Sequence, residues 1–468
     1  MAKKKILLLG DDIRLNSGIG TMSREIVMGT LHKYDWVNLG GAIKHPESGK
    51  GFIDMSEDAA KETGVQDAYI KVLPVDGYGN PDILRDIMEI EKPDAIMHFT
   101  DPRFWGWLYN MAHEIRTEIP LMYYNIWDDL PYPHWNEPFY ESCDLLMGIS
   151  KQTYNINKHV CQNKPRVEDV DLTYVQHGID DKKYLPLDEM NSEFIGTQTA
   201  LFGEKDIDFV AFFNSRNIRR KGISDLIQAF GQFQSGLSEE EKDRVALLLH
   251  TDIVDEHGTN LQSVANNLYP NINIIFSTAK LPFEKLNVLY NIADVTCCPS
   301  SAEGFGLSHM ESLMAGTPTI ATVLGGLQDQ MGFKVNGEEL SVKHFSEEIP
   351  SNSTKLMSED YGKWVYPLWP IRSLQGSPPT PYIYDSRPDI SDIEKGLRWW
   401  YDMGREKRKL CGLEGRKWAI ENKFNREGMC NAIIDSFEGL FKIWKPLDSF
   451  ELLDTSKNKP NYPTGVLV

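Results

Sequence analysis

Two glutamates frame the segment of this sequence with the clearest chemical content, which begins at Glu303 and ends at Glu311. Gly304 and Gly306 lie between them and lack side chains, so the backbone here can approach a ligand closely. A helical pattern opens near Leu307, which predicts one carboxylate in a loop and the second about one turn inside a helix. A helix start offers unpaired N–H groups and a positive dipole end. This combination suits a polyhydroxylated, anionic ligand, and a sugar nucleotide fits that description.

A second candidate site is cationic and runs from Arg216 to Lys221 and Gly222. An arginine fork matches phosphate oxygens, and a lysine can neutralise charge that builds on a departing phosphate. The segment follows a predicted strand, which favours a phosphate site, although a loop with four cations is also typical of a solvated surface. We expect Arg219 and Arg220, between the two named cations, to face solvent.

The elements that must position these residues follow an alternating pattern of short apolar strands and helices. The predicted strands are Ile6–Leu9, Ala95–Phe99, Leu121–Asn125, Leu145–Ile149, Phe209–Phe213, Val245–His250, Ile272–Phe276, Val295–Cys298 and Thr319–Val323. Such alternation predicts an α/β protein with parallel, doubly wound sheets. The pattern breaks at 185–205, where we place a linker between Rossmann-like domains at 1–195 and 205–444. An aromatic-rich insertion is expected at 327–390.

The segment from Glu303 to Glu311, together with Gly316-Thr-Pro318, resembles the Glu-x7-Glu signature of retaining GT-B glycosyltransferases. That family, glycosyltransferase group 1, includes glycogen and sucrose synthases. Arg216 and Lys221 resemble its Arg-x4-Lys-Gly motif. The alternative interpretation, a surface loop with two solvated glutamates, leaves the glycine spacing without a cause.

The resemblance implies a GT-B fold with two domains facing a cleft and a nucleotide-diphosphate sugar as donor. It also implies that Glu303 binds sugar hydroxyls and Glu311 the ribose, while Arg216 and Lys221 hold the diphosphate. A front-face displacement without a covalent intermediate is the implied mechanism. No cofactor is predicted and a metal is not required, because the cations take its role. The tail 445–468 is expected to pack on the first domain.

Further donor contacts are expected from two glycine loops. Gly18 and Gly20 resemble the family's Gly-Gly-x-Gly loop, although a plain strand-to-helix turn is an open alternative. Phe305, Gly306 and Leu307 complete the predicted donor-binding set. His98, at the end of a predicted strand, resembles the family's histidine near the anomeric centre, while a histidine that merely ends a strand is the alternative.

An acceptor side is suggested by aromatic residues after other strands of the first domain. Asp128 follows Trp127, and Trp105 belongs to Phe104-Trp-Gly-Trp107. Aromatic faces stack on sugars and on bases, so Asp128, Trp127 and Trp105 are candidate acceptor contacts, with core packing as the alternative for any single ring.

The bulk composition limits the function classes. The chain has 468 residues, 41% of them hydrophobic, and a formal net charge of −19. This charge disfavours DNA and anionic membranes as partners. No apolar run approaches the roughly 18 residues that a membrane span needs. The six cysteines have no CxxC spacing and favour a reducing, cytoplasmic location.

The predicted function is transfer of a sugar from a nucleotide sugar to the hydroxyl of a glycan or small molecule. Three alternatives remain open. The acceptor could be a modified DNA base or a protein, the chain could bind a sugar nucleotide without turnover, or it could be a disaccharide phosphorylase.

Overall fold

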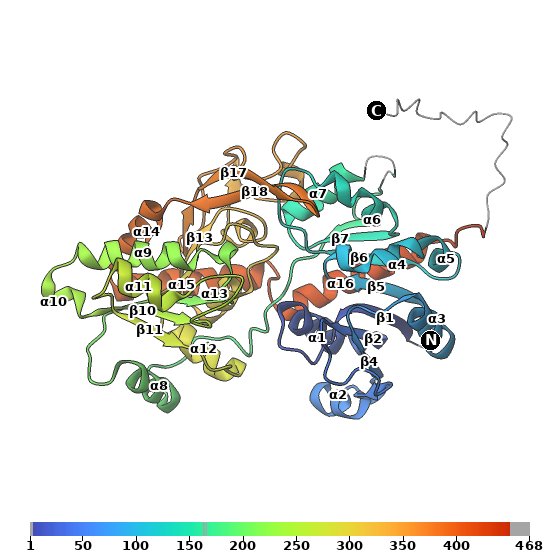
Figure 1. The fold of residues 1–468 in the computed structure, drawn as a ribbon, viewed down its shortest axis with the longest axis horizontal. Coiled ribbons are helices and arrows are strands. Elements are labelled where there is room, and N and C mark those ends of the chain that lie inside the picture. The colour runs from blue at the N-terminus through green and yellow to red at the C-terminus, as the bar shows by residue number, and fades with distance from the viewer. Residues whose placement is uncertain (1–2, 162–163, 165, 450–468) are drawn as a thin grey trace.

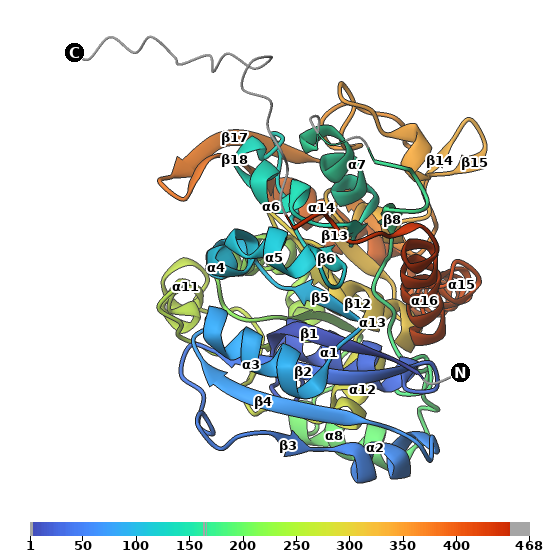
Figure 2. The same ribbon diagram turned by 90° about the vertical axis from the view of Figure 1, so that its right-hand side faces the viewer.

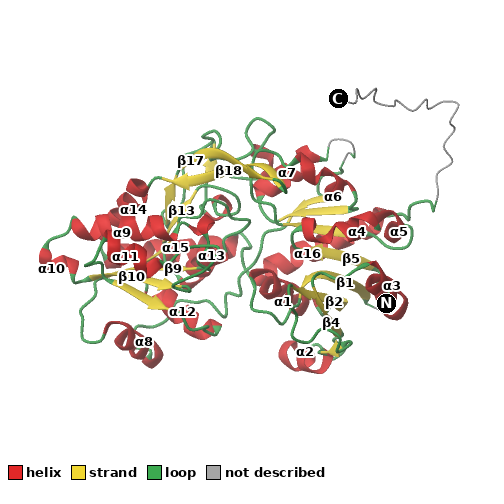
Figure 3. Ribbon diagram, viewed as in Figure 1, coloured by secondary structure: helices red, strands yellow, loops and turns green. Residues whose placement is uncertain are grey.

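The computed structural model describes residues 3–161, 164 and 166–449, and two parallel sheets organise them (Figure 1). Helices pack around each sheet (Figure 3). The first sheet has the order β3-β4-β2-β1-β5-β6-β7-β8, and only the short β3 runs antiparallel to its neighbour. Its strands are β1 Lys4–Asp11, β2 Tyr34–Ala42, β3 Ile53–Asp54, β4 Ile70–Asp76, β5 Ala95–Phe99, β6 Leu121–Asn125, β7 Leu145–Gly148 and β8 Leu172–Tyr174.

The second sheet has the order β11-β10-β9-β12-β13-β16, and all its neighbouring strands are parallel. Its strands are β9 Phe209–Asn214, β10 Val245–His250, β11 Ile274–Ser277, β12 Val295–Cys298, β13 Thr319–Thr322 and β16 Val365–Leu368. Two antiparallel hairpins lie outside both sheets: β14 Lys334–Val335 with β15 Glu338–Glu339, and β17 Pro370–Ser377 with β18 Thr380–Pro388.

The helices fall between the strands, as the alternating sequence pattern predicts. Those of the first half are α1 Gly18–Thr30, α2 Ser56–Thr63, α3 Pro81–Glu91, α4 Gly106–Asn110, α5 Ala112–Arg116, α6 Glu137–Glu141 and α7 Lys151–Val160. The remainder are α8 Ser192–Phe202, α9 Ile223–Ser235, α10 Glu239–Lys242, α11 Leu261–Leu268, α12 Phe283–Ile292, α13 Leu307–Ala315, α14 Ile390–Met403, α15 Arg405–Glu421 and α16 Arg426–Ile443. No helix in the described ranges is long and apolar enough to cross a membrane.

Strand β1 has a continuously apolar sequence because both of its faces are buried. Ile6 and Leu8 belong to one buried cluster, whereas Leu7 and Leu9 belong to another. Successive side chains of a strand point to opposite faces, so a strand covered on both faces has no polar alternation. The central strands of the sheet are therefore buried on both sides.

The chain crosses between the two halves earlier than the sequence suggested. The second domain was predicted to extend to residue 444, but α16 packs against α1 beside the first sheet (Figures 1 and 2). Phe437 of α16 contacts the rings of Tyr34 and Trp36 at the start of β2. The buried ring provides an apolar partner for this strand. Of the predicted tail 445–468, the part from residue 450 lies outside the described residues, and the amide of Leu447 donates to the carbonyl of Arg116 (2.8 Å).

Two other predicted boundaries differ in detail. The linker region contains α8, whose Phe194 and Phe202 are buried in the cluster that includes Val210 and Phe212 of β9. The region 327–390 is not a single insertion, because β16 is an integral strand of the second sheet. Val365 and Leu368 of β16 are completely buried, so this strand belongs to the domain core.

Candidate active site

The loop between β12 and α13 has the geometry expected from its glycines. Gly306 has a φ of 92°, and a Cβ there would lie 2.3 Å from Cδ2 of Leu327. A side chain would therefore be both strained and in collision. Helix α13 begins at Leu307, and Glu311 lies about one turn inside it, as predicted.

Glu303 is held between two cations. Nζ of Lys221 donates to its Oε1, and Nη1 of Arg220 lies 3.3 Å from its Oε2. Ser300 donates a third hydrogen bond to Oε1 (3.2 Å). Burial alone would raise the pKa of Glu303, but the charges of Lys221 and Arg220 outweigh it and lower this pKa to about 2. Glu303 is therefore a carboxylate at any ordinary pH.

Burial lowers the pKa of Lys221, and Glu303 opposes this shift while Arg220 adds to it. The two partners of the ion pair thus both have lowered pKa values. The close contact between Lys221 and Glu303 stabilises the charged form of each group.

The cations reach Glu303 because the loop after β9 is fastened to the loop after β12. The amide of Ser301 donates to the carbonyl of Arg220 (2.7 Å). Gly222 adopts the left-handed conformation, and a Cβ there would lie 2.6 Å from the carbonyl oxygen of Pro299. The backbone can approach this closely only at a glycine. The Lys-Gly pair of the predicted motif therefore has a structural cause.

Arg216 does not join this cluster in the structure. Its side chain is 58% exposed and forms an ion pair with Asp255 (Nε to Oδ2, 2.7 Å). Arg220, which was expected to face solvent, is 42% exposed, yet its guanidinium donates to the carbonyl of Ala302 and contacts Glu303. The cation beside Glu303, other than Lys221, is therefore Arg220 and not the arginine that matches the motif. The sequence contains no signal that distinguishes them, because both are followed by polar residues in one loop.

Glu311 is embedded in tyrosine hydroxyls. Tyr290 donates to its Oε2 (2.6 Å), and the hydroxyl of Tyr184 also bonds to it. Burial raises the pKa of Glu311, and these two hydrogen bonds partly offset the shift. Neither tyrosine was predicted as a site residue, since each comes from a segment without a motif.

The start of α1 faces the start of α13. A Cβ on Gly18 would lie 3.7 Å from Cδ1 of Leu307, the first residue of α13. Gly20 has a different role, because a Cβ there would lie 2.6 Å from the carbonyl oxygen of Leu15. Gly20 is therefore needed for the tight turn itself, in agreement with the alternative interpretation of a plain strand-to-helix turn. The two helix starts place N–H donors near one another.

Asp128 joins the site from the first domain. A Cβ on Gly325 would lie 2.0 Å from the carbonyl oxygen of Glu303 and 3.9 Å from Cβ of Asp128. Glu303 and Asp128 are therefore both close to Gly325. Burial raises the pKa of Asp128, Arg220 lowers it, and Glu303 raises it further. Trp127 is half-buried, donates to the carbonyl of Asp129 (2.8 Å) and has the guanidinium of Arg103 over its ring (5.5 Å).

His98 and Trp105 lie in the core of the first domain. Nδ1 of His98 bonds to the hydroxyl of Tyr109 (2.7 Å), and its ring stacks on Tyr123 (5.1 Å). Burial lowers the pKa of His98 to about 3, so the imidazole is neutral. Trp105 is 0% exposed and cannot stack on a ligand, which corrects its prediction as an acceptor contact. Its neighbour Phe104 is 61% exposed and stacks on Tyr78.

No described interaction links His98 with Glu303. Nε2 of His98 has no hydrogen-bond partner among the described residues. The full burial of the ring and its stacking on Tyr123 fit the alternative interpretation, a histidine that ends a strand and packs in the core, and a contact of His98 with a donor stays a prediction. Within the described ranges, no group of three or more His, Cys, Asp or Glu side chains is arranged to hold a metal ion. Whether a metal is required stays a prediction.

Parts of this chain resemble known proteins. Residues 198–358 match the family model described as Glycosyl transferases group 1. The chain is 26% identical over 200 residues to the mannosylfructose-phosphate synthase of Agrobacterium fabrum, covering 40% of this chain and 39% of that protein. It is 28% identical over 141 residues to the MMP alpha-(1->4)-mannosyltransferase of Mycolicibacterium hassiacum, covering 30% and 32%. The matched stretches thus span less than half the length of these relatives.

Solved structures match almost the entire chain at low identity. Sucrose-phosphate synthase from Thermosynechococcus elongatus has a TM-score of 0.64 at 14% identity, and the match covers 94% of this chain and 100% of that chain. The Anabaena protein HepE, in complex with UDP-glucose, has a TM-score of 0.59 at 14% identity, covering 93% and 99%. These likenesses confirm the predicted GT-B fold.

Proposed function

We propose that this chain is a retaining glycosyltransferase that moves a sugar from a nucleotide-diphosphate sugar to an acceptor hydroxyl. The observation that carries the proposal is the cluster of Glu303, Lys221 and Arg220, which lies within the stretch matched by the group 1 model. A buried carboxylate between two cations, in a glycine loop at a helix start, supports binding of a ligand that carries both phosphates and hydroxyls.

The donor would bind by exchange of ion pairs. Its diphosphate would accept hydrogen bonds from Lys221 and Arg220, which now contact Glu303. Glu303 would then be free to accept from hydroxyls of the sugar. Glu311, already surrounded by hydroxyl donors, would accept from the ribose. The predicted contacts of Gly18, Phe305, Gly306 and Leu307 would be made by their backbone at the two helix starts.

The proposed reaction is a front-face displacement. The bond between the anomeric carbon and the phosphate oxygen breaks, and the bond to the acceptor oxygen forms on the same face. The leaving phosphate oxygen takes the proton of the acceptor hydroxyl, so no covalent enzyme intermediate forms. Lys221 stabilises the charge that develops on the phosphate. We propose that this stabilisation needs no metal, and we keep a cytoplasmic location as a prediction.

The printed names of similar proteins indicate which acceptors and donors to test first. The names of the relatives include synthases of sugar phosphates, which makes sugars and sugar phosphates the first acceptors to test. HepE, a structural neighbour, binds UDP-glucose, which makes UDP-sugars the first donors to test.

The test is a donor screen with the purified chain. Thermal stability and nucleotide release are measured with UDP-, GDP- and ADP-sugars in phosphate-free buffer, for the wild type, Lys221→Ala and the control Arg219→Ala. We expect one donor to stabilise the wild type and to release nucleotide slowly, and both effects to weaken only in Lys221→Ala. Release of the sugar as its α-anomer from an α-linked donor, detected by NMR, would support retention. Equal behaviour of both variants would overturn the phosphate assignment, and turnover only with added phosphate would favour a phosphorylase.

A further inference from the structure

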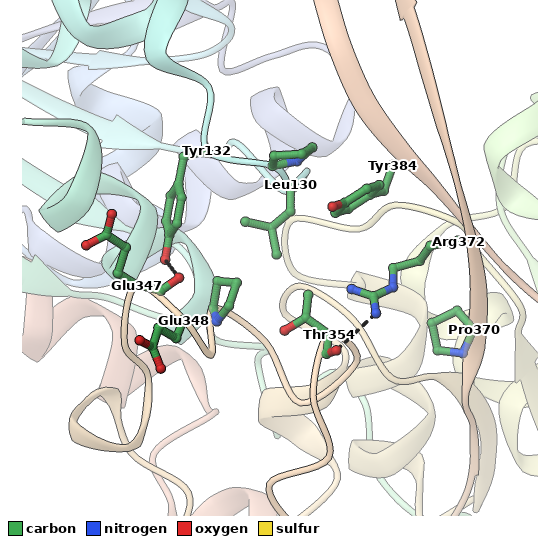
Figure 4. A pocket seen from close by; sticks show the side chains of 10 residues that line it. Leu130, Tyr132, Glu347, Glu348, Thr354, Pro370, Arg372 and Tyr384 are labelled. Carbon is green, nitrogen blue, oxygen red and sulfur yellow. Dashed lines mark hydrogen bonds between the residues drawn. The ribbon is translucent and has the colours of Figure 1, made fainter.

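A cavity of 590 Å³ lies between the first domain and the region after β15 (Figure 4). Leu130 and Tyr132, from the segment after β6, form one side. Glu347, Glu348, Arg372 and Tyr384, from the later region, form the other. The volume falls within the range of about 300–1,000 Å³ that is typical of small-molecule sites.

Contacts between the two halves hold the walls of this cavity together. The amide of Tyr384 donates to the carbonyl of Leu130 (2.6 Å). The hydroxyl of Tyr132 donates to the carbonyls of Ser346 (3.0 Å) and Glu347 (3.2 Å). Tyr382 of the same hairpin donates to the carbonyl of Tyr132 (3.2 Å). Figures 1 and 2 both place the hairpin β17–β18 beside α6 and α7 of the first domain. The cavity is therefore assembled jointly by the two halves.

The lining combines aromatic rings with oriented polar groups. Arg372 lies over the ring of Tyr384 (5.4 Å) and donates one hydrogen bond to the carbonyl of Thr354 (3.0 Å). These contacts fix the guanidinium, and the remaining N–H groups can donate to a ligand. The side chains of Glu347 and Glu348 form no ion pair with any other residue in the described part of the chain, so their oxygens can accept from hydroxyls.

This chemistry selects among ligand classes. Half-buried tyrosines supply faces on which a pyranose can stack, and the carboxylates and guanidinium supply acceptors and donors for its hydroxyls. Two carboxylates against one guanidinium give the cavity a negative balance, which disfavours phosphate groups. A neutral sugar residue fits best.

The cavity is close to the site of reaction. Leu130 is two residues beyond Asp128, which lies beside Glu303. Two residues of extended chain span at most about 7 Å. The wall of the cavity at Leu130 therefore lies within this span of Asp128.

We propose that this cavity holds a sugar residue of an oligosaccharide acceptor, one or more residues away from the hydroxyl that reacts. The inference rests on the proposed function, because it extends the acceptor site of that reaction. It names the acceptor class as a neutral oligosaccharide and gives the region after β15 a part in its selection.

The test compares ligands that differ in length. Binding of methyl α-glucoside, maltose and maltotriose, and of the corresponding manno-series, is measured by ligand-observed NMR with the full chain. The variants are Arg372→Ala and Tyr384→Ala, with Leu374→Ala as the control, because Leu374 is 64% exposed on the same hairpin and does not line the cavity. The main-chain bond from residue 384 to Leu130 is retained in Tyr384→Ala, and thermal melting checks that each variant is folded.

We expect at least one series in which the trisaccharide binds about tenfold more tightly than the monosaccharide. Arg372→Ala and Tyr384→Ala should abolish this gain with length, while Leu374→Ala should keep it. Absence of the gain in both series, its survival in both cavity variants, or competition by inorganic phosphate would overturn the inference. Nucleotide release from the donors is measured in parallel with each oligosaccharide present as acceptor. Release without the gain in affinity with ligand length overturns this inference alone, whereas the gain without release from any donor overturns the proposed transferase.

Discussion

In the cluster of Glu303, Lys221 and Arg220 one carboxylate is shared by two cations, so an incoming diphosphate must displace that carboxylate from both of them. The exchange keeps the two cations paired before and after binding. It also makes the site selective for ligands that offer both an anion for the cations and hydroxyls for Glu303. A ligand with only one of these groups would leave a buried charge without its partner. A free phosphate is thereby a poorer ligand than a sugar nucleotide.

The position of Arg220 leads to a first prediction. We expect Arg220→Ala to lower turnover of the nucleotide sugar by about 10²–10³-fold, since one positioned donor to the leaving group is removed. Arg216→Ala should have a smaller effect, because Arg216 is exposed and already paired with Asp255. Steady-state kinetics of both variants, with Arg219→Ala as the control, decide between them. If Arg216→Ala is the more damaging, the loop must rearrange when the donor binds, and the motif assignment is right after all.

The low pKa of Glu303 leads to a second prediction. Because this pKa is depressed to about 2 in the folded state, its ion pairs stabilise the fold above the unfolded pKa and lose their effect as pH falls toward 2. We therefore expect the stability of the wild type to fall more steeply than that of Glu303→Gln between about pH 4.5 and pH 2. Thermal denaturation of both proteins across this range measures the difference. Parallel curves would show that the ion pairs contribute no net stability.

The individual side-chain partners could only partly be predicted from the sequence. The Glu303 and Glu311 spacing and the Lys-Gly pair have strong local causes, namely a helix start and two close backbone approaches. The choice between Arg216 and Arg220 depends instead on a short 3₁₀ turn, Arg219–Lys221, that carries Arg220 toward the loop after β12. Trp105 was misassigned because an aromatic residue after a strand has the same appearance in sequence whether it points to the core or to solvent.

At the scale of elements, the turn at Gly306 sets where α13 begins. We predict that Gly306→Ala destabilises the protein and weakens donor binding, because φ is 92° and the new Cβ would collide with Leu327. Gly337→Ala is a matched control, since Gly337 has a similar φ of 85° but no atom within 4 Å of its Cβ position. Urea unfolding midpoints should fall more for Gly306→Ala than for Gly337→Ala, whose cost is about 1–3 kcal/mol of backbone strain. Equal losses would mean that Leu327 moves away easily.

The strands that were predicted have mainly apolar runs, and the missed strands have a more polar or irregular composition. β2 contains Asn38, which is buried and donates to the carbonyl of Leu8 (3.3 Å) while accepting from the amide of Ile13 (3.1 Å). Such a residue lowers the apparent strand signal, yet its hydrogen bonds are satisfied in the fold. β16 was absorbed into the predicted insertion because it lies among prolines and tryptophans. Its pairing with β13 is a tertiary contact that a local pattern does not contain.

At the scale of the whole molecule, two of the connections between the halves differ in kind. α16 returns to the first sheet, and the hairpin β17–β18 with the loop at 346–347 contacts the segment after β6. The first connection buries apolar rings, whereas the second is a set of hydrogen bonds to main-chain carbonyls with one aromatic contact between Trp135 and Tyr382 (4.5 Å). Hydrogen bonds of this kind have a modest net strength, so we expect the second connection to open more readily than the first.

The last prediction concerns the first connection and which of the two sheets a mutation there destabilises. Phe437 is fully buried against Tyr34 and Trp36, although it lies about four hundred residues after them in the chain, and Phe→Ala changes at such sites cost about 3–5 kcal/mol. Phe437→Ala should therefore loosen the first sheet while the second sheet keeps its protection. Hydrogen exchange measured by mass spectrometry should increase in peptides of β1, β2 and α1.

Leu397→Ala is the matched control, because Leu397 is fully buried in the cluster that contains Phe209 and Leu247 of the second sheet. Its effect should appear in peptides of β9 and β10 instead. Faster exchange in both sheets for either variant would mean that the two halves unfold as one cooperative unit, and the crossing helix would then couple them rather than serve the first alone.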